Sequence, residues 1–214
     1  MRSVRVFFKK GGRTKYISHL DLNRFMLKII RKSKIPVWYS EGFNPHPYIT
    51  FALPLSLGFE SDFEIMDIRL DDDSYSNDAV FNALVNLLPD GFKLISCADP
   101  VMKAGQVCYA DYKITFDSDE YVLLDEIYAF LQSDSIISYK KTKKGSTKEI
   151  QLKDYIKDFS VNNGVLYLTL AAGGSSNLNP KLVLDAFSSS KSIELPAYDV
   201  TRTMLYNENM ENFK

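Results

Sequence analysis

The sequence is poor in the residues that build metal and redox sites. Among its 214 residues are only two cysteines and two histidines. Cys97 and Cys108 form none of the short CxxC spacings that hold zinc or iron–sulfur clusters. We therefore expect no metal and no cofactor, and we expect both cysteines to be small, buried and reduced.

Long apolar runs are also missing. No segment approaches the roughly 20 apolar residues of a membrane-spanning helix, and the start, MRSVRVFFKKGG, has no apolar stretch of signal-peptide length. With 45% hydrophobic and 25% charged residues, the composition is typical of a globular protein rather than a disordered one. We expect a cytoplasmic protein without a membrane partner.

The net charge of −1 conceals an unequal distribution. Residues 1–48 carry eleven Lys and Arg against Asp21 and Glu41, which gives +9, whereas the remaining residues carry 15 basic and 25 acidic side chains, which gives −10. A concentrated positive field suits an anionic partner, nucleic acid first among them. Segregated charge can also serve a protein partner.

Hydrophobic spacing in the first half predicts the order strand, helix, strand, strand, helix, strand. Ser18 followed by Asp21 predicts a capping box at the start of the first helix. Apolar residues then recur at helical spacing, with basic residues mainly on the opposite side. The predicted strands are 4–9, 35–39, 63–70 and 93–97, and an extended apolar run, YITFALPLSLGF, is predicted after the proline-rich loop. The first predicted helix begins at His19, after the Ser18 cap, and the second spans residues 76–88.

The same order recurs after a predicted boundary near residues 99–106. The predicted strands are 107–116, 136–139, 150–161, 165–170 and 200–206, the helices are 119–131 and 180–187, and a basic turn, KKTKKGST, follows the second strand. The sequence therefore predicts an α+β protein of two tandem ferredoxin-like (βαββαβ) repeats with antiparallel sheets. The predicted domains are residues 1–100 and 105–214.

The segment KKGGRTKYISHLDLNR sets a Gly-Gly turn between the first strand and a helix N-terminus. Backbone N–H groups in such a turn, and helix N-termini, attract anions. The spacing is not that of a Walker A loop, so nucleotide hydrolysis is disfavoured, and an ordinary turn with solvated lysines explains the segment equally well. The candidate nucleic-acid-binding residues are Lys9, Lys10, Gly11, Gly12, Arg13, Lys15, Tyr16, Ser18, His19, Arg24 and Lys28.

A second candidate segment, EGFNPHPYITF, holds His46 between two prolines. Each proline restricts its own φ and biases the preceding residue towards an extended conformation, so we expect a stiff loop. We expect this loop to meet the His19 turn across a basic cleft, with Arg202 on the last predicted strand pointing into the same cleft. The loop adds Gly42, Phe43, Asn44 and His46 to the candidate nucleic-acid-binding residues.

Two further hypotheses concern RNA. His19, His46 and Tyr16 are weak candidates for metal-independent cleavage through the 2′-hydroxyl, the alternative being that the imidazoles pack or hydrogen-bond under their loops. In addition, the ferredoxin-like order would place Arg5, Phe7 and Lys9 beside Ile65, Asp67 and Arg69 on the sheet face away from the helices. Such a face can stack single-stranded RNA, unless another part of the protein covers it.

The segment YISHLDLNRFMLKIIRKSKIPVWYSEGFNPHPYITFALPLSLGFES resembles the signature of the radical SAM-linked family, and NLNPKLVLDAF and VTRTMLY resemble its C-terminal pattern. Family members are fused behind a radical SAM enzyme or stand alone, often encoded near ribosomal-protein genes and a ribonuclease of the E/G type. The resemblance implies a radical SAM enzyme as partner. The three-cysteine cluster motif of that enzyme is missing, so any radical chemistry would belong to the partner.

The predicted layout is also similar to that of the CRISPR repeat-processing endoribonucleases, which place a histidine soon after the first strand, as His19 is placed here. Our leading hypothesis is an RNA-binding accessory module, without catalytic activity of its own, that presents RNA or a ribonucleoprotein to a radical SAM enzyme. One alternative is a metal-independent, RAMP-like endoribonuclease using His19 or His46. Another is a protein-interaction scaffold without RNA.

Overall fold

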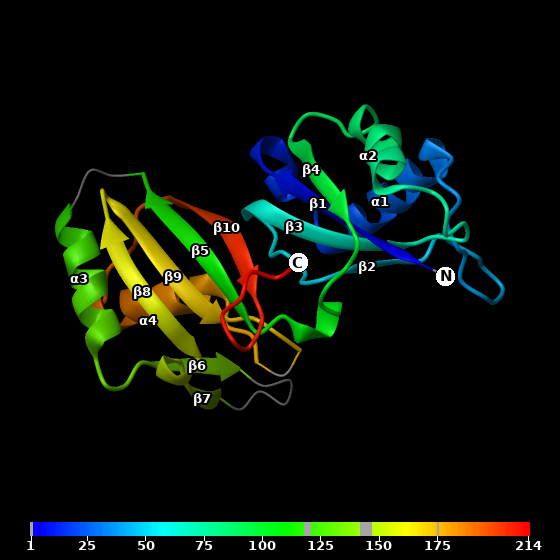
Figure 1. The fold of residues 1–214 in the computed structure, drawn as a ribbon. Helices are drawn as coiled ribbons and strands as arrows, with labels where there is room; N and C mark the ends of the chain where they lie inside the picture. Colours follow the sequence, from blue (N-terminus) through cyan, green and yellow to red (C-terminus); the bar gives the residue numbers. More distant parts are fainter. Residues whose placement is uncertain (1, 118–120, 142–146, 175) are drawn as a thin grey trace. The chain divides into compact units, whose positions relative to one another are not determined.

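The computed structural model describes residues 2–117, 121–141, 147–174 and 176–214 (Figure 1). The chain divides into two compact units: unit 1 comprises Met1–Val107 and Asn212–Lys214, and unit 2 comprises Cys108–Glu211. Each unit contains an antiparallel sheet and two α-helices, so the fold is α+β. The C-terminal three residues belong to unit 1, which the repeat pattern did not predict.

Unit 1 is built on a sheet in which β1 and β3 are central neighbours. Its elements are β1 (Ser3–Lys10), the 3₁₀ helix η1 (Gly12–Tyr16), α1 (His19–Ser33), β2 (Ile49–Phe51), β3 (Glu60–Arg69), α2 (Asn77–Val85), β4 (Phe92–Ala98) and the 3₁₀ helix η2 (Ala104–Gln106). The strands run in the order β4-β1-β3, and β2 also pairs with β3. Arg5 lies opposite Asp67 and Phe7 opposite Ile65, which confirms the predicted neighbours.

The two faces of this sheet differ because side chains alternate along each strand. Val6, Met66 and Ile68 point towards the helices and join the hydrophobic core with Leu22 and Met26 of α1. The apolar stripe of α1 was predicted correctly from its helical spacing. Residues between them in the sequence, among them Arg5 and Asp67, occupy the opposite face.

Helix α1 begins with the Ser18 cap that its sequence predicts. The backbone N–H of Asp21 donates to Ser18 Oγ at 3.2 Å, and the Ser18 hydroxyl donates to Asp21 Oδ2 at 2.7 Å. Lys34 ends the helix in the left-handed region, at φ 58°. Lys28 and its basic neighbours are exposed, because the apolar stripe faces the core.

The predicted strand at 35–39 is wrong: the second strand, β2, follows the proline-containing loop instead of preceding it. Only single bridges tie this segment to its surroundings, Val37 to Leu70 and Tyr39 to Pro47. Pro36 has no N–H for a sheet ladder, and the Val37 N–H bonds locally to Ile35 O at 2.8 Å. The edge of β3 is paired with β2 over Met66 to Ile68.

Unit 2 is a sheet of order β10-β5-β9-β8 with a separate hairpin, β6-β7. Its elements are β5 (Tyr109–Phe116), α3 (Tyr121–Gln132), β6 (Ile137–Lys141), β7 (Thr147–Gln151), the 3₁₀ helix η3 (Lys153–Tyr155), β8 (Ile156–Asn162), β9 (Val165–Ala171), α4 (Pro180–Lys191) and β10 (Tyr198–Tyr206). As predicted, Asn179 caps α4 and Pro180 begins it. The predicted strand at 150–161 is two strands separated by η3, and residues 142–146 of the basic turn lie outside the described residues.

Both cysteines are unpaired and half-buried. Within the described ranges, no helix combines the length and the apolar character needed to cross a membrane.

Candidate nucleic-acid interface

The Gly-Gly turn, predicted to bind phosphate, is filled by the protein's own acceptors. The Gly12 N–H donates to Glu60 Oε1 at 2.7 Å, and the Gly11 N–H donates to Gly91 O at 2.8 Å. The Lys10 side chain is only 1% exposed, with Nζ at 3.5 Å from Lys15 O. A carboxylate therefore occupies the position where a phosphate would meet this turn.

The other candidates near the turn are at the surface but partly neutralised. Lys9 pairs with Asp62 at 2.7 Å, and Arg24 lies 3.4 Å from Asp21. Tyr16 is exposed, and the Lys15 ammonium lies 5.5 Å from the centre of its ring. Ser18 serves as the helix cap, and Arg13 is exposed.

The two histidines have separate structural partners. The His19 ring packs edge-on against Phe51 of β2, with 5.1 Å between ring centres. His46 closes its own loop, because its Nδ1 lies 3.1 Å from both Ser40 Oγ and Asn44 O. The backbone N–H of His46 also donates to Ser40 Oγ at 3.2 Å.

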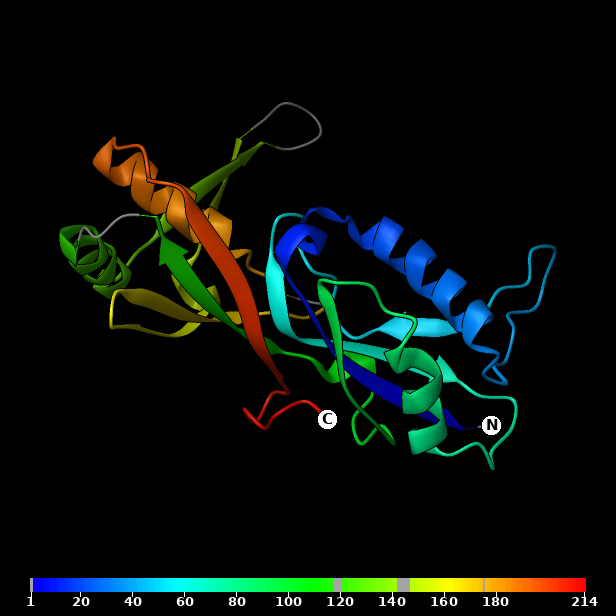
Figure 2. The same ribbon diagram turned by 90° about the horizontal axis from the view of Figure 1, so that it is seen from above.

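These histidines lie towards opposite ends of α1, so the predicted common cleft does not form. His19 begins the helix, whereas the loop that carries His46 projects beyond the helix C-terminus (Figure 2). The helix has 15 residues, a length of about 22 Å at 1.5 Å per residue. In this conformation the two imidazoles cannot act on the same phosphodiester. The third predicted member, Arg202, lies in β10 of unit 2 and is 1% exposed.

Exposed cations in the last turns of α1 are followed along the chain by exposed aromatic residues of the proline-containing loop. We name this group the helix–loop surface; its members are Lys28, Arg31, Lys32, Lys34, Tyr39 and Phe43. All six side chains are exposed. In the described part of the chain, none of the four cations has a carboxylate within ion-pairing distance. Sequence reasoning included Lys28 and Phe43 but missed the grouping, which the density of cations in residues 28–34 could have indicated.

Acidic residues border this surface. Glu41 lies in the loop itself, and the Asp71 N–H donates to Pro36 O at 2.9 Å, which brings the acidic run at 71–73 close to the start of the loop. The negative charge therefore borders the loop side of this surface, whereas its positive charge lies on α1.

Phe43 is presented at the tip of a closed loop. Tyr39 and Pro47 bridge the base of the loop, and the Ser40 N–H donates to His46 O at 2.9 Å. Gly42 has φ +120°, a conformation that side chains disfavour. Phe43 beyond it is 105% exposed. The loop that the two prolines are predicted to stiffen thus exposes an apolar ring to solvent.

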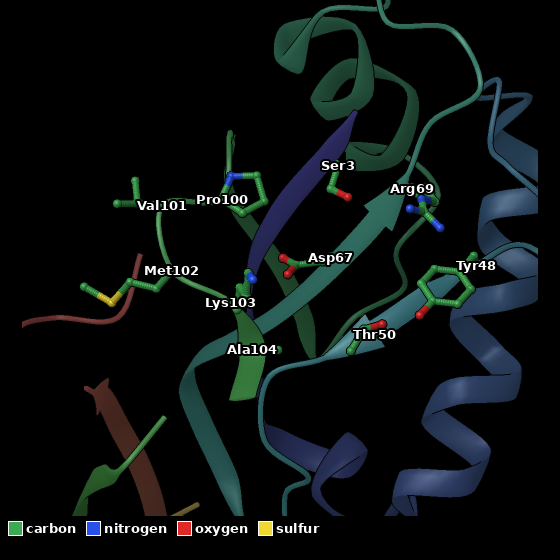
Figure 3. Close-up of a pocket in the computed structure, with 10 residues that line it drawn as sticks. All are labelled: Ser3, Tyr48, Thr50, Asp67, Arg69, Pro100, Val101, Met102, Lys103 and Ala104. Atoms are coloured by element: carbon green, nitrogen blue, oxygen red, sulfur yellow. The ribbon is translucent and has the colours of Figure 1, made fainter. Parts of the chain in front are cut away.

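On the other side of the loop, Arg69 is held by two aromatic rings. Its guanidinium carbon lies 5.1 Å from the centre of the Trp38 ring and 5.5 Å from that of Tyr48. The two rings meet edge-on, 5.5 Å apart. Tyr48 and Arg69 also line a pocket of about 430 Å³ on the sheet face away from α1 (Figure 3).

The sheet face predicted to stack RNA is closed around Arg5. This side chain is fully buried, binds both Asp67 carboxylate oxygens at 2.7 Å, and donates to Met102 O at 2.7 Å. Phe213 from the chain's end lies 4.8 Å from the guanidinium. Phe7 is 7% exposed, so neither Arg5 nor Phe7 is available to a base.

Two groups elsewhere have strongly raised pKa values. In unit 2, Asp111 accepts hydrogen bonds from Thr169 Oγ1 and from the Tyr206 hydroxyl, both at 2.6 Å. Burial, followed by this bond, raises the pKa of Tyr206 to about 12. In unit 1, burial raises the pKa of the Cys97 thiol to about 12. Among the described residues, no three His, Cys, Asp or Glu side chains are grouped so that they could hold a metal ion.

The sequence matches one family model over most of its length. The model, described as "Uncharacterized protein conserved in bacteria (DUF2344)", covers residues 3–180. No curated protein matches the sequence. Among solved structures, a chain in the crystal structure of a Cbf5-Nop10-Gar1 complex is similar at a TM-score of 0.49 and 8% identity, over 95% of this chain and 50% of that chain. This chain thus spans about half the length of that one, and a likeness at this score carries no argument about function.

Proposed function

The chain belongs to the bacterial family DUF2344, and we propose that it is an RNA-binding module that grips single-stranded RNA on the helix–loop surface of unit 1. Phosphates would contact the cations of α1, and a base would stack on Phe43. The observation that carries the proposal is the combination of exposed cations, which have no acidic partner among the described residues, and an exposed ring on a closed loop.

Each part of this surface contributes differently to binding. Cations without acidic partners release counterions from the RNA backbone without first breaking an ion pair. An aromatic ring adds a stacking platform that any base can use. Because the loop is already closed, little conformational entropy is lost when the ring is covered. Single-stranded RNA fits this surface better than a duplex, since only unpaired bases can stack on a protruding side chain.

A direct experiment compares Phe43→Ala with the matched control Leu57→Ala, which truncates another exposed apolar side chain of unit 1, 62% exposed. Binding of a fluorescein-labelled single-stranded RNA is measured by anisotropy at low salt. Loss of one stacked base costs about 1–3 kcal/mol, so Phe43→Ala should weaken binding about 5- to 150-fold and Leu57→Ala should have little effect. Absence of binding by the wild type, or equal losses in the two variants, would contradict the proposal.

We further propose that the module binds RNA without cleaving it. His19 and His46 are each engaged in packing or loop closure, which supports this part. Incubation of the protein with RNA in EDTA tests it: cleavage that disappears in both His19→Ala and His46→Ala would favour the endoribonuclease alternative instead.

The partner proposed for this module is a radical SAM enzyme, and that part rests on the resemblance of residues 16–61 to the radical SAM-linked signature alone. If such an enzyme co-purifies with the module and nuclease treatment separates the two, the result would support presentation of RNA. Co-purification that survives nuclease and high salt would favour a protein scaffold.

We also infer that the two units repeat one ferredoxin-like βαββαβ arrangement. In support, the strand order is β4-β1-β3-β2 in unit 1 and β10-β5-β9-β8 in unit 2, with the first and third main strands adjacent in both. The β6-β7 hairpin would then be an insertion into the second repeat.

A further inference from the structure

The pocket beside Arg69 is separate from the helix–loop surface. Ser3, Asp67 and Arg69 line it, and in the sequence they alternate with core residues that face the helices. The pocket therefore lies on the opposite face of the sheet from α1. Residues 100–104 form its other wall, across Asp67 from Arg69 and Tyr48 (Figure 3).

The Arg69 guanidinium is held in position by aromatic rings and, among the described residues, is not neutralised by a carboxylate. The Trp38 and Tyr48 rings hold its guanidinium in place. In the part of the chain that the structure describes, no carboxylate lies within ion-pairing distance of it, and no hydrogen-bond acceptor is bound to its N–H groups. A planar guanidinium held in this way presents a rigid set of donors to a phosphate.

The remaining groups of the pocket leave an excess of positive charge. Asp67 is an acid in the wall, but Arg5 binds both of its carboxylate oxygens at 2.7 Å. Lys103 is exposed and, among the described residues, has no ion pair. Arg69 and Lys103 therefore supply two positive charges that no acid of the pocket neutralises.

Uncharged side chains add two further features. Ser3 and Thr50 bring hydroxyl groups, and Thr50 lies directly opposite Asp67 in the β2–β3 ladder. Tyr48, a residue that is 45% exposed, lines the pocket and offers an aromatic ring to a planar group. The volume of about 430 Å³ is within the range of small-molecule sites.

We propose that this pocket binds the terminal phosphate of a nucleotide. Arg69 and Lys103 contact the phosphate, Ser3 and Thr50 donate hydrogen bonds to it or to the sugar, and the base stacks on Tyr48. The same chemistry is offered by a free nucleoside 5′-monophosphate and by the 5′-phosphorylated end of an RNA. The inference goes beyond RNA binding by α1, because it depends on none of the helix–loop residues.

The test is titration calorimetry with 5′-AMP and adenosine, in wild type and in two single variants. 5′-AMP should bind and adenosine should not, because the phosphate carries the recognition. Arg69→Gln should weaken 5′-AMP binding about 10- to 100-fold, the value of one lost charge-assisted contact. The control Lys93→Gln removes an exposed lysine of β4 outside the pocket and should leave affinity unchanged.

The source of the phosphate is decided by a second pair of probes, one RNA sequence with a 5′-phosphate and with a 5′-hydroxyl. Preference for the phosphorylated RNA, lost in Arg69→Gln, assigns the pocket to an RNA end, whereas 5′-AMP binding without this preference assigns it to a free nucleotide. Unchanged binding of the 5′-hydroxyl RNA by Arg69→Gln shows that the helix–loop surface acts independently.

Folding of the variants is checked by circular dichroism and thermal unfolding. Lys103→Gln, which replaces an exposed side chain, provides a second removal of charge from the pocket in case Arg69→Gln does not fold. The inference is overturned if neither 5′-AMP nor 5′-phosphorylated RNA binds through the pocket, or if binding is equal in wild type and in a folded pocket variant.

Discussion

Removing two cations from the helix–loop surface should change the salt dependence of RNA binding by a calculable amount. Each phosphate contact to single-stranded nucleic acid contributes about −0.7 to the slope of log K against log salt concentration. If Lys28, Arg31, Lys32 and Lys34 each contact one phosphate, the slope of the wild type is about −2.8. The double variant Lys28→Gln/Arg31→Gln should reduce its magnitude to about 1.4.

The affinity change follows from the same slopes. If the two proteins have equal affinity when extrapolated to 1 M salt, the double variant binds about 25-fold more weakly at 0.1 M. The assay is fluorescence anisotropy with one single-stranded RNA at five or more salt concentrations between 0.05 and 0.3 M, roughly the range in which counterion release dominates. Both substitutions replace exposed side chains, so the fold should be preserved.

A matched control separates local contact from total charge. Lys93→Gln/Lys157→Gln removes the same number of exposed cations, one from β4 of unit 1 and one from β8 of unit 2. This control should retain the wild-type slope. Equal slopes in all three proteins, or equal reductions in both variants, would refute the assignment of phosphate contacts to α1.

Three further predictions concern buried or hydrogen-bonded groups. Asp67→Asn leaves the fully buried Arg5 guanidinium without its counter-charge and should lower the free energy of unfolding in urea by about 3–5 kcal/mol. The pKa of Tyr206, raised to about 12 mainly by burial and then by its bond to Asp111, means that the fold favours the neutral phenol. Its contribution to stability should therefore be complete below pH 10 and be lost as the pH rises towards 12, relative to Tyr206→Phe. Because burial raises the pKa of Cys97 to about 12, this thiol should be alkylated slowly at pH 8 in the native protein and rapidly in guanidinium.

Each of these has a result that would contradict it. A urea midpoint unchanged in Asp67→Asn would show that the Arg5 guanidinium finds solvent or another acceptor. If the free energies of unfolding of wild type and Tyr206→Phe change in parallel between pH 9 and 12, the result would argue against a raised pKa of Tyr206. Native-state alkylation of Cys97 as fast as in guanidinium would show that the thiol is not protected.

Much of the local structure follows from short-range sequence patterns. The cap formed by Ser18 and Asp21 and the start of α4 at Pro180 were predicted correctly, since each depends on residues within one helical turn. The segment 35–39 was mistaken for a strand, since its composition does not show that β3 pairs with residues after the loop. The single strand predicted at 150–161 is two strands, because η3 interrupts it.

The candidate interface depended more strongly on contacts between distant residues. The basic face of α1 was visible in the sequence, and Phe43 was already a candidate. The predicted cleft between His19 and His46 was not formed, because His19 packs against β2 at the start of α1, whereas His46 is held within its own loop by Ser40 and Asn44. Arg69 was predicted only as a member of the sheet face away from the helices, because the rings that orient it come from either side of the loop.

The sequence by itself determined where the positive charge is concentrated, which face of α1 enters the core, and that a proline-containing loop lies at residues 41–48. These properties depend on composition and on spacing within a few residues. Only the tertiary structure decided which charges remain available to a ligand. Glu60, which is 48 positions from Gly12, neutralises the Gly-Gly turn because the antiparallel pairing of β1 with β3 brings the two segments together. By the same long-range pairing Asp67 neutralises Arg5. In the described ranges, by contrast, no carboxylate lies within ion-pairing distance of the cations at the end of α1.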